Sequence, residues 1–295
     1  MDLPPRSSPS PWSDLGRPPL RATPLRRALL GAPGPWTSLD LVPATGSTND
    51  DLAARATAGT ALDGAVLTTD HQRAGHGRHD RVWTAPPRSS IAVSVLVVPG
   101  SPGSPVPQAR WSWLPLLAGV AVAQALTDVA GVQAALKWPN DVLLEVDGDP
   151  DGGGKVCGVL AQVVTTPTGP AVVLGLGLNV SQRADELPVP TAASLATAAA
   201  TTTDRDTVLR AVLRTLGTWV QDWRAAAGDP HACGLAPAYR SASSTIGRQV
   251  GVHLPGDEVL LGAAVDVDDD GRLVVAPADG SPARALAAGD VVHVR

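Results

Sequence analysis

Four short stretches of this sequence carry the polar side chains of a ligand site. They are GSTND (46–50), QRAGHGRHDRVW (72–83), KWPND (137–141) and GGGKVCG (152–158). Hydroxyls and amides hydrogen-bond neutral polar groups, whereas arginine and lysine neutralise phosphate or negative charge that develops during a reaction. If the four stretches converge, the sequence predicts a site for a small polar molecule beside a phosphate-bearing one. The glycines of the second stretch let the backbone move and approach a ligand closely.

Rare residue types fall within these motifs. The chain has 21 arginines but only two lysines, Lys137 and Lys155, and only three asparagines, Asn49, Asn140 and Asn179. Lysine supplies a compact ammonium with rotatable donors, and asparagine combines a donor with an acceptor. Asparagine also favours turns, and two of the three lie at expected turns. We interpret all five residues as functional, because each lies in a short unusual motif.

The composition restricts the class of protein. The 295 residues are 44% apolar and carry a net charge of −5, which argues against general nucleic-acid binding. Two cysteines, Cys157 and Cys233, indicate a reducing interior, and neither is expected to be a nucleophile. The N-terminus lacks the apolar core of a signal peptide, and the run around LPLLAGVAVAQAL is expected to be too short to span a bilayer. We therefore expect a cytoplasmic protein without a membrane partner.

The pattern of elements predicts an α+β fold with three segments. Residues 1–38 are rich in proline and arginine and are expected to be largely disordered, with one short helix near LRRALL. Residues 39–236 combine strands, a helix capped near Ser47, a buried helix at WSWLPLLAGVAVAQALTDVAG and a helical region from about 192 to 227. Residues 237–295 show short strands and turns, which is typical of a small β-barrel.

The ordered motifs resemble those of the biotin protein ligases. GSTN, Q-x-A-G-x-G-R-x-x-R-x-W, KWPND, G-K-x-x-G-V-L and GLGLN occur in the family's order, and the resemblance runs from about residue 37 to the C-terminus. No P-loop is present, and GLGLNV does not match a dinucleotide-binding fingerprint. The resemblance implies a mixed-sheet catalytic domain followed by an SH3-like barrel. It also implies that biotin and ATP form biotinyl-5′-adenylate, from which biotin passes to a carrier lysine.

The resemblance assigns roles by position. Arg78 and Lys155 would hold the biotin carboxylate and the α-phosphate, and are the expected catalytic residues. Residues expected at biotin are Ser47, Thr48, Asn49, Gln72, His76, Gly77, Arg78, Lys155 and Gly158. Residues expected at ATP are Arg81, Trp83, Asn140 and Asn179, with Trp83 on the adenine and Asn179 at its edge. Supporting roles fall to Lys137, Asp141, Gly175 and Gly177, and glycines 158, 175 and 177 would let backbone approach the ligand. Mg²⁺ is expected to bind through phosphates and not through protein ligands.

Two positions depart from the family pattern. The loop commonly reads GRGRxGR in the family and reads GHGRHDR here, so that His76 replaces an arginine and Asp80 replaces a glycine. A neutral histidine would weaken a purely electrostatic role at position 76. Asp80 would add a negative charge beside a phosphate site, and Asp80→Gly is expected to alter loop closure.

Three other interpretations are open at this stage. A lipoate or octanoate transferase shares the fold, although KWPND, the GHGR loop and the C-terminal barrel favour biotin. A biotin-sensing repressor would need a DNA-binding domain, and fewer than 40 residues precede the catalytic part. A non-catalytic biotin-binding module would not need both Arg78 and Lys155. The expected partner is the carrier domain of a biotin-dependent carboxylase, and a homodimer through a sheet edge is a further expectation.

Overall fold

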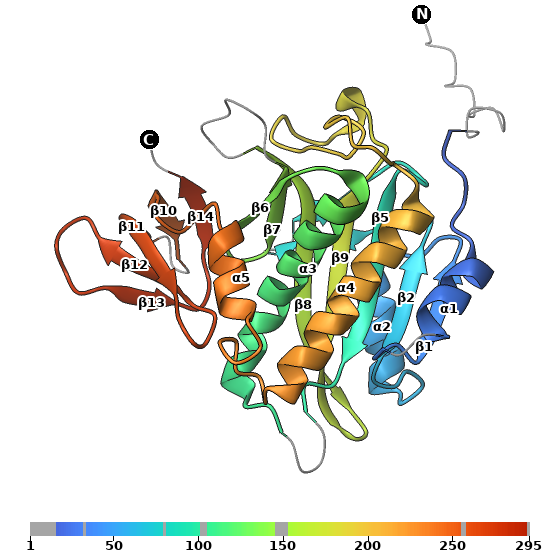
Figure 1. The fold of residues 1–295 in the computed structure, drawn as a ribbon, viewed down its shortest axis with the longest axis horizontal. Helices are drawn as coiled ribbons and strands as arrows, with labels where there is room; N and C mark the ends of the chain where they lie inside the picture. Colours follow the sequence, from blue (N-terminus) through green and yellow to red (C-terminus); the bar gives the residue numbers. More distant parts are fainter. Residues whose placement is uncertain are drawn as a thin grey trace, which may run out of the picture.

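A seven-stranded mixed sheet forms the centre of the larger part of the protein in the computed structural model (Figure 1). The structure describes residues 16–31, 34–78, 81–100, 105–144, 153–254 and 258–293. In spatial order the strands are β1 (Ser38–Val42), β2 (Ala65–Thr69), β5 (Ser90–Val97), β9 (Gly169–Asn179), β8 (Gly154–Thr166), β7 (Asp141–Leu144) and β6 (Ala134–Lys137). Only β1 and β2 pair in parallel, and every other neighbouring pair is antiparallel.

Helices cover both faces of this sheet. α3 (Trp113–Ala130) and α4 (Arg205–Ala225) pack on one face, and α2 (Thr48–Thr57) lies on the other (Figure 1). β5 is a nearly continuous apolar run because both of its faces are covered. α2 begins as the sequence predicts, since the hydroxyl of Ser47 accepts a hydrogen bond from the backbone N–H of Asp50 at 3.3 Å.

The C-terminal residues form a separate antiparallel sheet of five strands. In spatial order they are β13 (Arg284–Leu286), β12 (Leu273–Pro277), β11 (Val259–Val267), β10 (Gln249–His253) and β14 (Asp290–His293). No pairing between the edge strands β13 and β14 closes a barrel within the part of the chain that the structure describes. α5 (Leu235–Ala242) lies between α3 and this sheet (Figure 1).

Several hydrogen bonds fasten the C-terminal region to the larger part, and two tryptophans donate some of them. The indole N–H of Trp138 donates to the carbonyl of Gly271 at 3.2 Å, and that of Trp113 donates to the carbonyl of Asp269 at 2.8 Å. The backbone N–H of Trp138 donates to the hydroxyl of Thr245 at 3.1 Å. Trp138 belongs to the KWPND motif, so this motif connects the two sheets.

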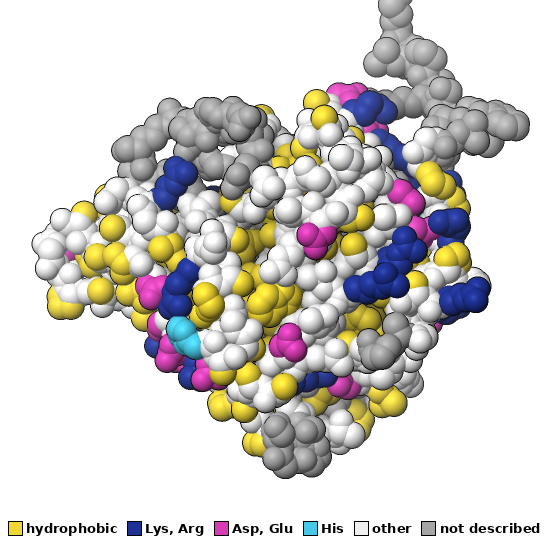
Figure 2. Space-filling view, in the orientation of Figure 1, with side chains coloured by type: hydrophobic (Ala, Val, Ile, Leu, Met, Phe, Trp, Pro, Cys, Tyr) yellow, Lys and Arg dark blue, Asp and Glu magenta, His cyan; other side chains and the backbone are white. Residues whose placement is uncertain are grey.

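The N-terminal region is more ordered than expected. α1 (Ala22–Leu30) packs beside β1 and buries Leu25 and Leu29, and residues 16–21 make specific contacts with the larger part of the protein. The expectation of disorder is therefore wrong for residues 16–21, whereas the expected short helix near LRRALL is confirmed by α1. Residues 1–15 lie outside the described residues. Figure 2 shows basic side chains gathered over α1 and the adjoining part of α4.

The expected helical region from 192 to 227 is wrong at its start, because α4 begins only at Arg205. Side chains between 194 and 197 bond to the backbone in place of a helix: the hydroxyl of Ser194 donates to the carbonyl of Gln182, and the N–H of Thr197 donates to the hydroxyl of Ser194. Such local bonds compete with helical ones. α5 and β13, which are eight and three residues long, were not expected from the sequence.

One apolar helical stretch joins a 3-10 helix, Gln108–Ser112, to α3. The helix Gln108–Ala130 has the length and composition to cross a membrane, which corrects the expectation that this segment is too short. However, 72% of its most apolar window is buried inside the protein. It packs on the sheet beside α4, and this is the position of a core helix.

Candidate functional site

A cavity of about 540 Å³ opens on the sheet face opposite α3 and α4, within the size range of cofactor sites. All four sequence motifs contribute to its lining. Every candidate site residue lies in it: Ser47, Thr48, Asn49, Gln72, His76, Gly77, Arg78, Arg81, Trp83, Lys137, Asn140, Asp141, Lys155, Gly158, Gly175, Gly177 and Asn179. The expected convergence of the four motifs is confirmed.

One end of the cavity, which we call the amide end, consists of Thr48, Asn49, Gln72 and the underlying Ser94. The side-chain oxygen of Gln72 accepts from the backbone N–H of Thr48 at 2.9 Å and from its hydroxyl at 3.2 Å. The hydroxyl of Ser94 lies 2.8 Å from the Thr48 hydroxyl and 2.6 Å from the Asn49 side-chain oxygen. These polar groups are held in place by one another before any ligand arrives.

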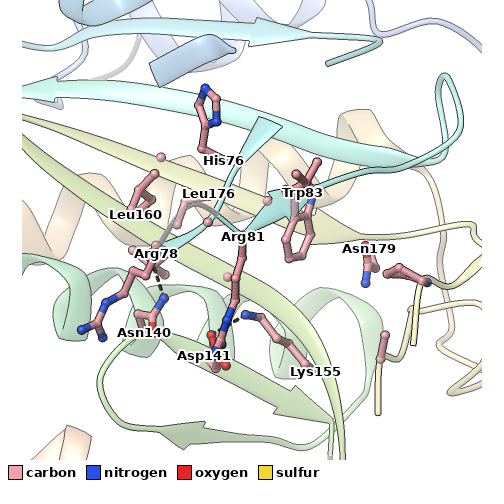
Figure 3. Close-up of a pocket in the computed structure, with 18 of the residues that line it drawn as sticks. His76, Arg78, Arg81, Trp83, Asn140, Asp141, Lys155, Leu160, Leu176 and Asn179 are labelled. Atoms are coloured by element: carbon pink, nitrogen blue, oxygen red, sulfur yellow. Dashed lines mark hydrogen bonds and ion pairs between the residues drawn. The ribbon is translucent and has the colours of Figure 1, made fainter. Parts of the chain in front are cut away.

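The other end, which we call the charged end, contains Arg78, Arg81, Lys137, Asp141 and Lys155. The ammonium of Lys155 forms an ion pair with Asp141 at 2.6 Å, and both side chains remain partly exposed. The side chains of Arg81 and Lys155 point toward Asp141 (Figure 3). Within the described ranges, Lys137 has no ion-pair partner. Cations therefore outnumber carboxylates at this end, as binding of an anion requires.

Burial perturbs one of these cations. Burial lowers the pKa of the Arg78 guanidinium, and the carboxylates of Asp290 and Asp141 oppose that shift. A partly desolvated guanidinium interacts more strongly with an anion than an exposed one does, because water screens it less. Arg78 is thus placed to bind a charged group inside the cavity.

Trp83 packs closely against strands β9 and β8, and glycine makes this possible. A Cβ atom at Gly177 would lie 2.6 Å from the indole ring, and one at Gly158 would lie 3.3 Å from it. A Cβ atom at Gly175 would lie 2.0 Å from the side-chain oxygen of Asn49. In this structure these glycines therefore admit neighbouring side chains of the pocket. The ammonium of Lys155 lies 5.7 Å from the centre of the Trp83 ring, at the distance of a cation–π contact.

Two asparagines of the site are anchored to the protein itself. The side-chain amide of Asn140 donates to the carbonyl of Val159 at 2.9 Å. The Asn179 amide donates to the carbonyl of Ala193 at 3.0 Å, and its oxygen accepts from the Gln182 side chain at 2.8 Å. Asn179 is almost fully buried and orients the segment after β9.

The stretch QRAGHGRHDRVW (72–83) contains a small hairpin instead of an irregular loop. β3 (Gly75–His76) pairs with β4 (Val82–Trp83). The imidazole of His76 lies 2.8 Å from the carboxylate of Asp50 in the first turn of α2, and it points away from the charged end (Figure 3). Asp80 lies outside the described residues, so its expected effect on loop closure stays a prediction.

Several contributors to the cavity were not found from the sequence. The C-terminal sheet supplies Gly289, Asp290 and Val292, and Asp290 pairs with Arg81. This ion pair, with the guanidinium donating to the carboxylate, raises the pKa of Arg81. The DVVHVR segment contains no signal that indicates a site. Ser94 was detectable, because it is the single hydroxyl within the apolar run IAVSVLVV that follows Ser90.

Comparison with protein families gives two matches. Residues 42–179 match the biotin/lipoate A/B protein ligase family, and residues 245–294 match the biotin protein ligase C terminal domain. The chain is 44% identical to the biotin–(acetyl-CoA-carboxylase) ligase of Mycobacterium tuberculosis over 95% of this chain and 97% of that protein. It is 29% identical to the bifunctional ligase/repressor BirA of Bacillus subtilis, over 82% of this chain and 69% of that protein.

Solved structures share the fold. The biotin protein ligase of Aquifex aeolicus in complex with biotin and ATP superposes with a TM-score of 0.69 at 23% identity, covering 88% of this chain and all of that one. A biotin protein ligase of Leishmania major in complex with biotin gives a TM-score of 0.55 at 21% identity, over 85% of this chain and 98% of that one.

Proposed function

The chain belongs to the biotin/lipoate A/B protein ligase family as a biotin protein ligase, and from this premise we propose that it activates biotin with ATP and transfers it to a carrier lysine. A carboxylate oxygen of biotin attacks the α-phosphorus of ATP, and the bond to pyrophosphate breaks. The carrier amine then attacks the acyl carbon of biotinyl-5′-adenylate, AMP leaves, and the nitrogen gives up a proton.

The observation that supports this proposal is the division of one cavity into an amide end and a charged end. We propose that the amide end binds the ring system of biotin through Thr48, Asn49 and Gln72, with Ser47 and Gly158 beside them. His76 and Gly77 would act through the loop backbone. The charged end would bring the biotin carboxylate and the α-phosphate together, because Arg78 and Lys155 offset the repulsion between two anions.

We place the nucleotide along Trp83, with Arg81, Asn140 and Asn179 around it. The indole of Trp83, which lines the cavity and packs against these glycines, would offer a stacking surface for adenine. Within the described residues, no group of three or more His, Cys, Asp or Glu side chains could hold a metal ion. Mg²⁺ usually binds through one or two carboxylates and the substrate phosphates. We propose that Mg²⁺ binds to ATP here, with Asp141 as the nearest carboxylate and Lys137 beside it.

The proposed partner is the carrier domain of a biotin-dependent carboxylase. Three exposed valines line the mouth of the cavity: Val82 on β4, Val189 after β9 and Val292 on β14. Exposed apolar side chains at one opening are typical of a protein-binding surface. The proposal includes no role for nucleic acid or a membrane and places the reaction in the cytoplasm.

Finer structural assignments are also proposals. We propose domain limits of 39–236 and 237–295, with the second domain an SH3-like barrel. The limit at 237 falls within α5, and the C-terminal family match begins at 245. A homodimer would form through β1 or β6, which are the edge strands of the large sheet. Sedimentation velocity at micromolar concentration tests that geometry.

The decisive experiment is ATP–pyrophosphate exchange with biotin, lipoate or octanoate offered in turn. We expect exchange with biotin, and we expect Lys155→Ala to lose it. Arg284→Ala is the control that also removes one positive charge. Arg284 lies on β13, at the opposite edge of the C-terminal sheet from β14, and pairs with Glu258 away from the cavity. Exchange with lipoate or octanoate alone would contradict the assignment to biotin, and no exchange with any acid would contradict adenylation.

A further inference from the structure

Residues 16–21, which we call the N-terminal strap, contact a segment that borders the cavity. The guanidinium of Arg17 donates to both carboxylate oxygens of Glu186, at 3.0 and 2.5 Å. The same guanidinium donates to the carbonyl of Ser181 at 2.8 Å. Both charged side chains are only 16% exposed, so this two-pronged contact is mostly screened from water.

The partner of the strap is residues 181–193, which we call the wall segment. Its residues Pro188, Val189, Thr191 and Ala192 line the cavity. Its first end is held by the residue that precedes β5, because the N–H of Ser181 donates to the carbonyl of Ser89 at 2.8 Å.

The far end of the wall segment is held by the backbone of Lys155. The N–H of Lys155 donates to the carbonyl of Thr191, and the N–H of Ala193 donates to the carbonyl of Lys155, both at 2.8 Å. Between these two ends, the described residues of the wall segment form three ion pairs, two of which lie within the segment. The third, between Glu186 and Arg17, connects the wall segment to the strap.

The strap is itself fixed to the catalytic part. Arg205 at the start of α4 donates to the carbonyl of Pro18 and to the carboxylate of Asp70, each at 2.7 Å. The same carboxylate oxygen of Asp70 also accepts a hydrogen bond from the strap, because the N–H of Leu20 donates to it at 3.0 Å. Arg17 therefore extends from a rigid base, and a rigid base can hold a loop in one position.

We propose that Arg17 is a positioning residue for the nucleotide: through Glu186 it holds the wall segment beside the part of the cavity in which we place ATP. This inference rests on the proposed function, because the wall segment borders Asn179 and Lys155 and lies away from the amide end. The strap thus completes the site from a part of the chain that lies more than 150 residues from the wall segment in sequence.

The charge state of the pair agrees with this role. The hydrogen bond from Arg17 holds the pKa of Glu186 below its ordinary value of 4.5. A carboxyl group with a lowered pKa stabilises the folded protein at pH values above the ordinary pKa of that group. This stabilisation is lost as the pH falls through the lowered pKa. The tie is consequently complete at neutral pH.

The test compares full-length Arg17→Ala with Arg21→Ala. Arg21 belongs to the same strap and pairs with Asp206 at 2.5 Å, but its partner lies on α4 and not on the wall segment. We expect Arg17→Ala to raise the KM for ATP in the exchange assay by about fivefold to tenfold, and to leave the KM for biotin within about twofold. Arg21→Ala should leave both values unchanged.

A second comparison asks whether Arg17 acts through Glu186. Glu186→Gln should reproduce the KM change, and the double variant should show no further increase, because the two residues act on one contact. Equal KM values for Arg17→Ala and Arg21→Ala, or additive effects in the double variant, would overturn the inference.

Hydrogen exchange separates failure of the inference from failure of the proposed function. Backbone amides of residues 187–192 should exchange faster in Arg17→Ala than in the wild-type chain or in Arg21→Ala. Absence of biotin-dependent exchange in the wild-type chain would reject the function, and the amide rates would still test the tie. Unchanged amide rates would reject the tie, whatever the activity.

Discussion

The amide end and the charged end of the cavity are built on different principles. At the amide end, Thr48, Asn49 and Gln72 bond to one another or to Ser94, and their positions are fixed by buried neighbours. At the charged end, Lys155 and Arg81 pair with carboxylates that a phosphate group could displace. A preformed end suits recognition of a neutral ring system, whereas exchangeable ion pairs suit an anion whose charge changes during the reaction.

The largest expected effect separates chemistry from recognition. Arg78→Gln should lower kcat/KM for exchange by about 100-fold or more, because it removes a partly desolvated cation at the point where two anions meet. Binding of biotin alone, measured by calorimetry, should weaken far less. A loss of biotin binding as large as the loss of exchange would show that recognition of biotin and the reaction do not depend on separate ends of the cavity.

Two glycines of β9 provide a matched pair of variants. Gly177→Ala brings a methyl group against the indole of Trp83, and we expect the KM for ATP to rise by about tenfold. Gly175→Ala brings one against Asn49 and should raise the KM for biotin, with a loss of stability of about 1–3 kcal/mol from overpacking. Gly34→Ala is the control, because no atom lies within 4 Å of its added Cβ. If both β9 variants changed the KM for ATP and the KM for biotin in the same way, the proposed separation of the two ends would be wrong.

A smaller effect is expected beneath the amide end. Ser94→Ala removes the hydroxyl that contacts both Thr48 and Asn49, and leaving buried polar atoms without a partner costs about 1–3 kcal/mol. Chemical denaturation measures this loss, and the KM for biotin should rise while that for ATP does not. Ser90→Ala on the same strand serves as the control. Equal stability of the two variants would contradict a preformed amide end.

The smallest effect is expected at Cys157, which lies on β8 with its side chain buried in the hydrophobic core. Burial raises the pKa of its thiol to about 12, so the group is a neutral thiol at physiological pH. Cys157→Ala should retain the exchange rate within about twofold, since a buried thiol acts as a small apolar side chain. Iodoacetamide should label this cysteine only after denaturation. Labelling of the native protein at Cys157 would show that this strand opens.

Much of the site could be predicted from the sequence because its residues lie in contiguous motifs. The cap at Ser47 and the apolar strand β5 follow from local patterns, and the rarity of lysine drew attention to Lys155. Asp290 and Arg17 could not be predicted in the same way. Their roles depend on contacts with Arg81 and Glu186, which lie far away along the chain.

The expected disorder fails for residues 16–21, the N-terminal strap, for a related physical reason. Composition predicts whether a segment can form its own core, but the strap needs no core of its own. It is held by Arg205 and Asp70, whose burial and pairing are properties of the folded catalytic part. Likewise, residues 192–204 have an alanine-rich sequence, yet the Ser194 hydroxyl bonds to Gln182 and Thr197, and the Ala193 N–H donates to the carbonyl of Lys155. These contacts take the place of a helix at this point of the chain.

The anchoring of Trp138 has a consequence for how the protein unfolds. Its indole and backbone bond to Gly271 and Thr245 of the C-terminal sheet, while Asn140 and Asp141, two and three residues later, line the cavity. Loss of the small sheet would release the strand that carries these ligand-site residues. The two sheets should therefore melt together as one cooperative unit, and a chain shortened before the C-terminal sheet should lose its nucleotide pocket together with the missing strands.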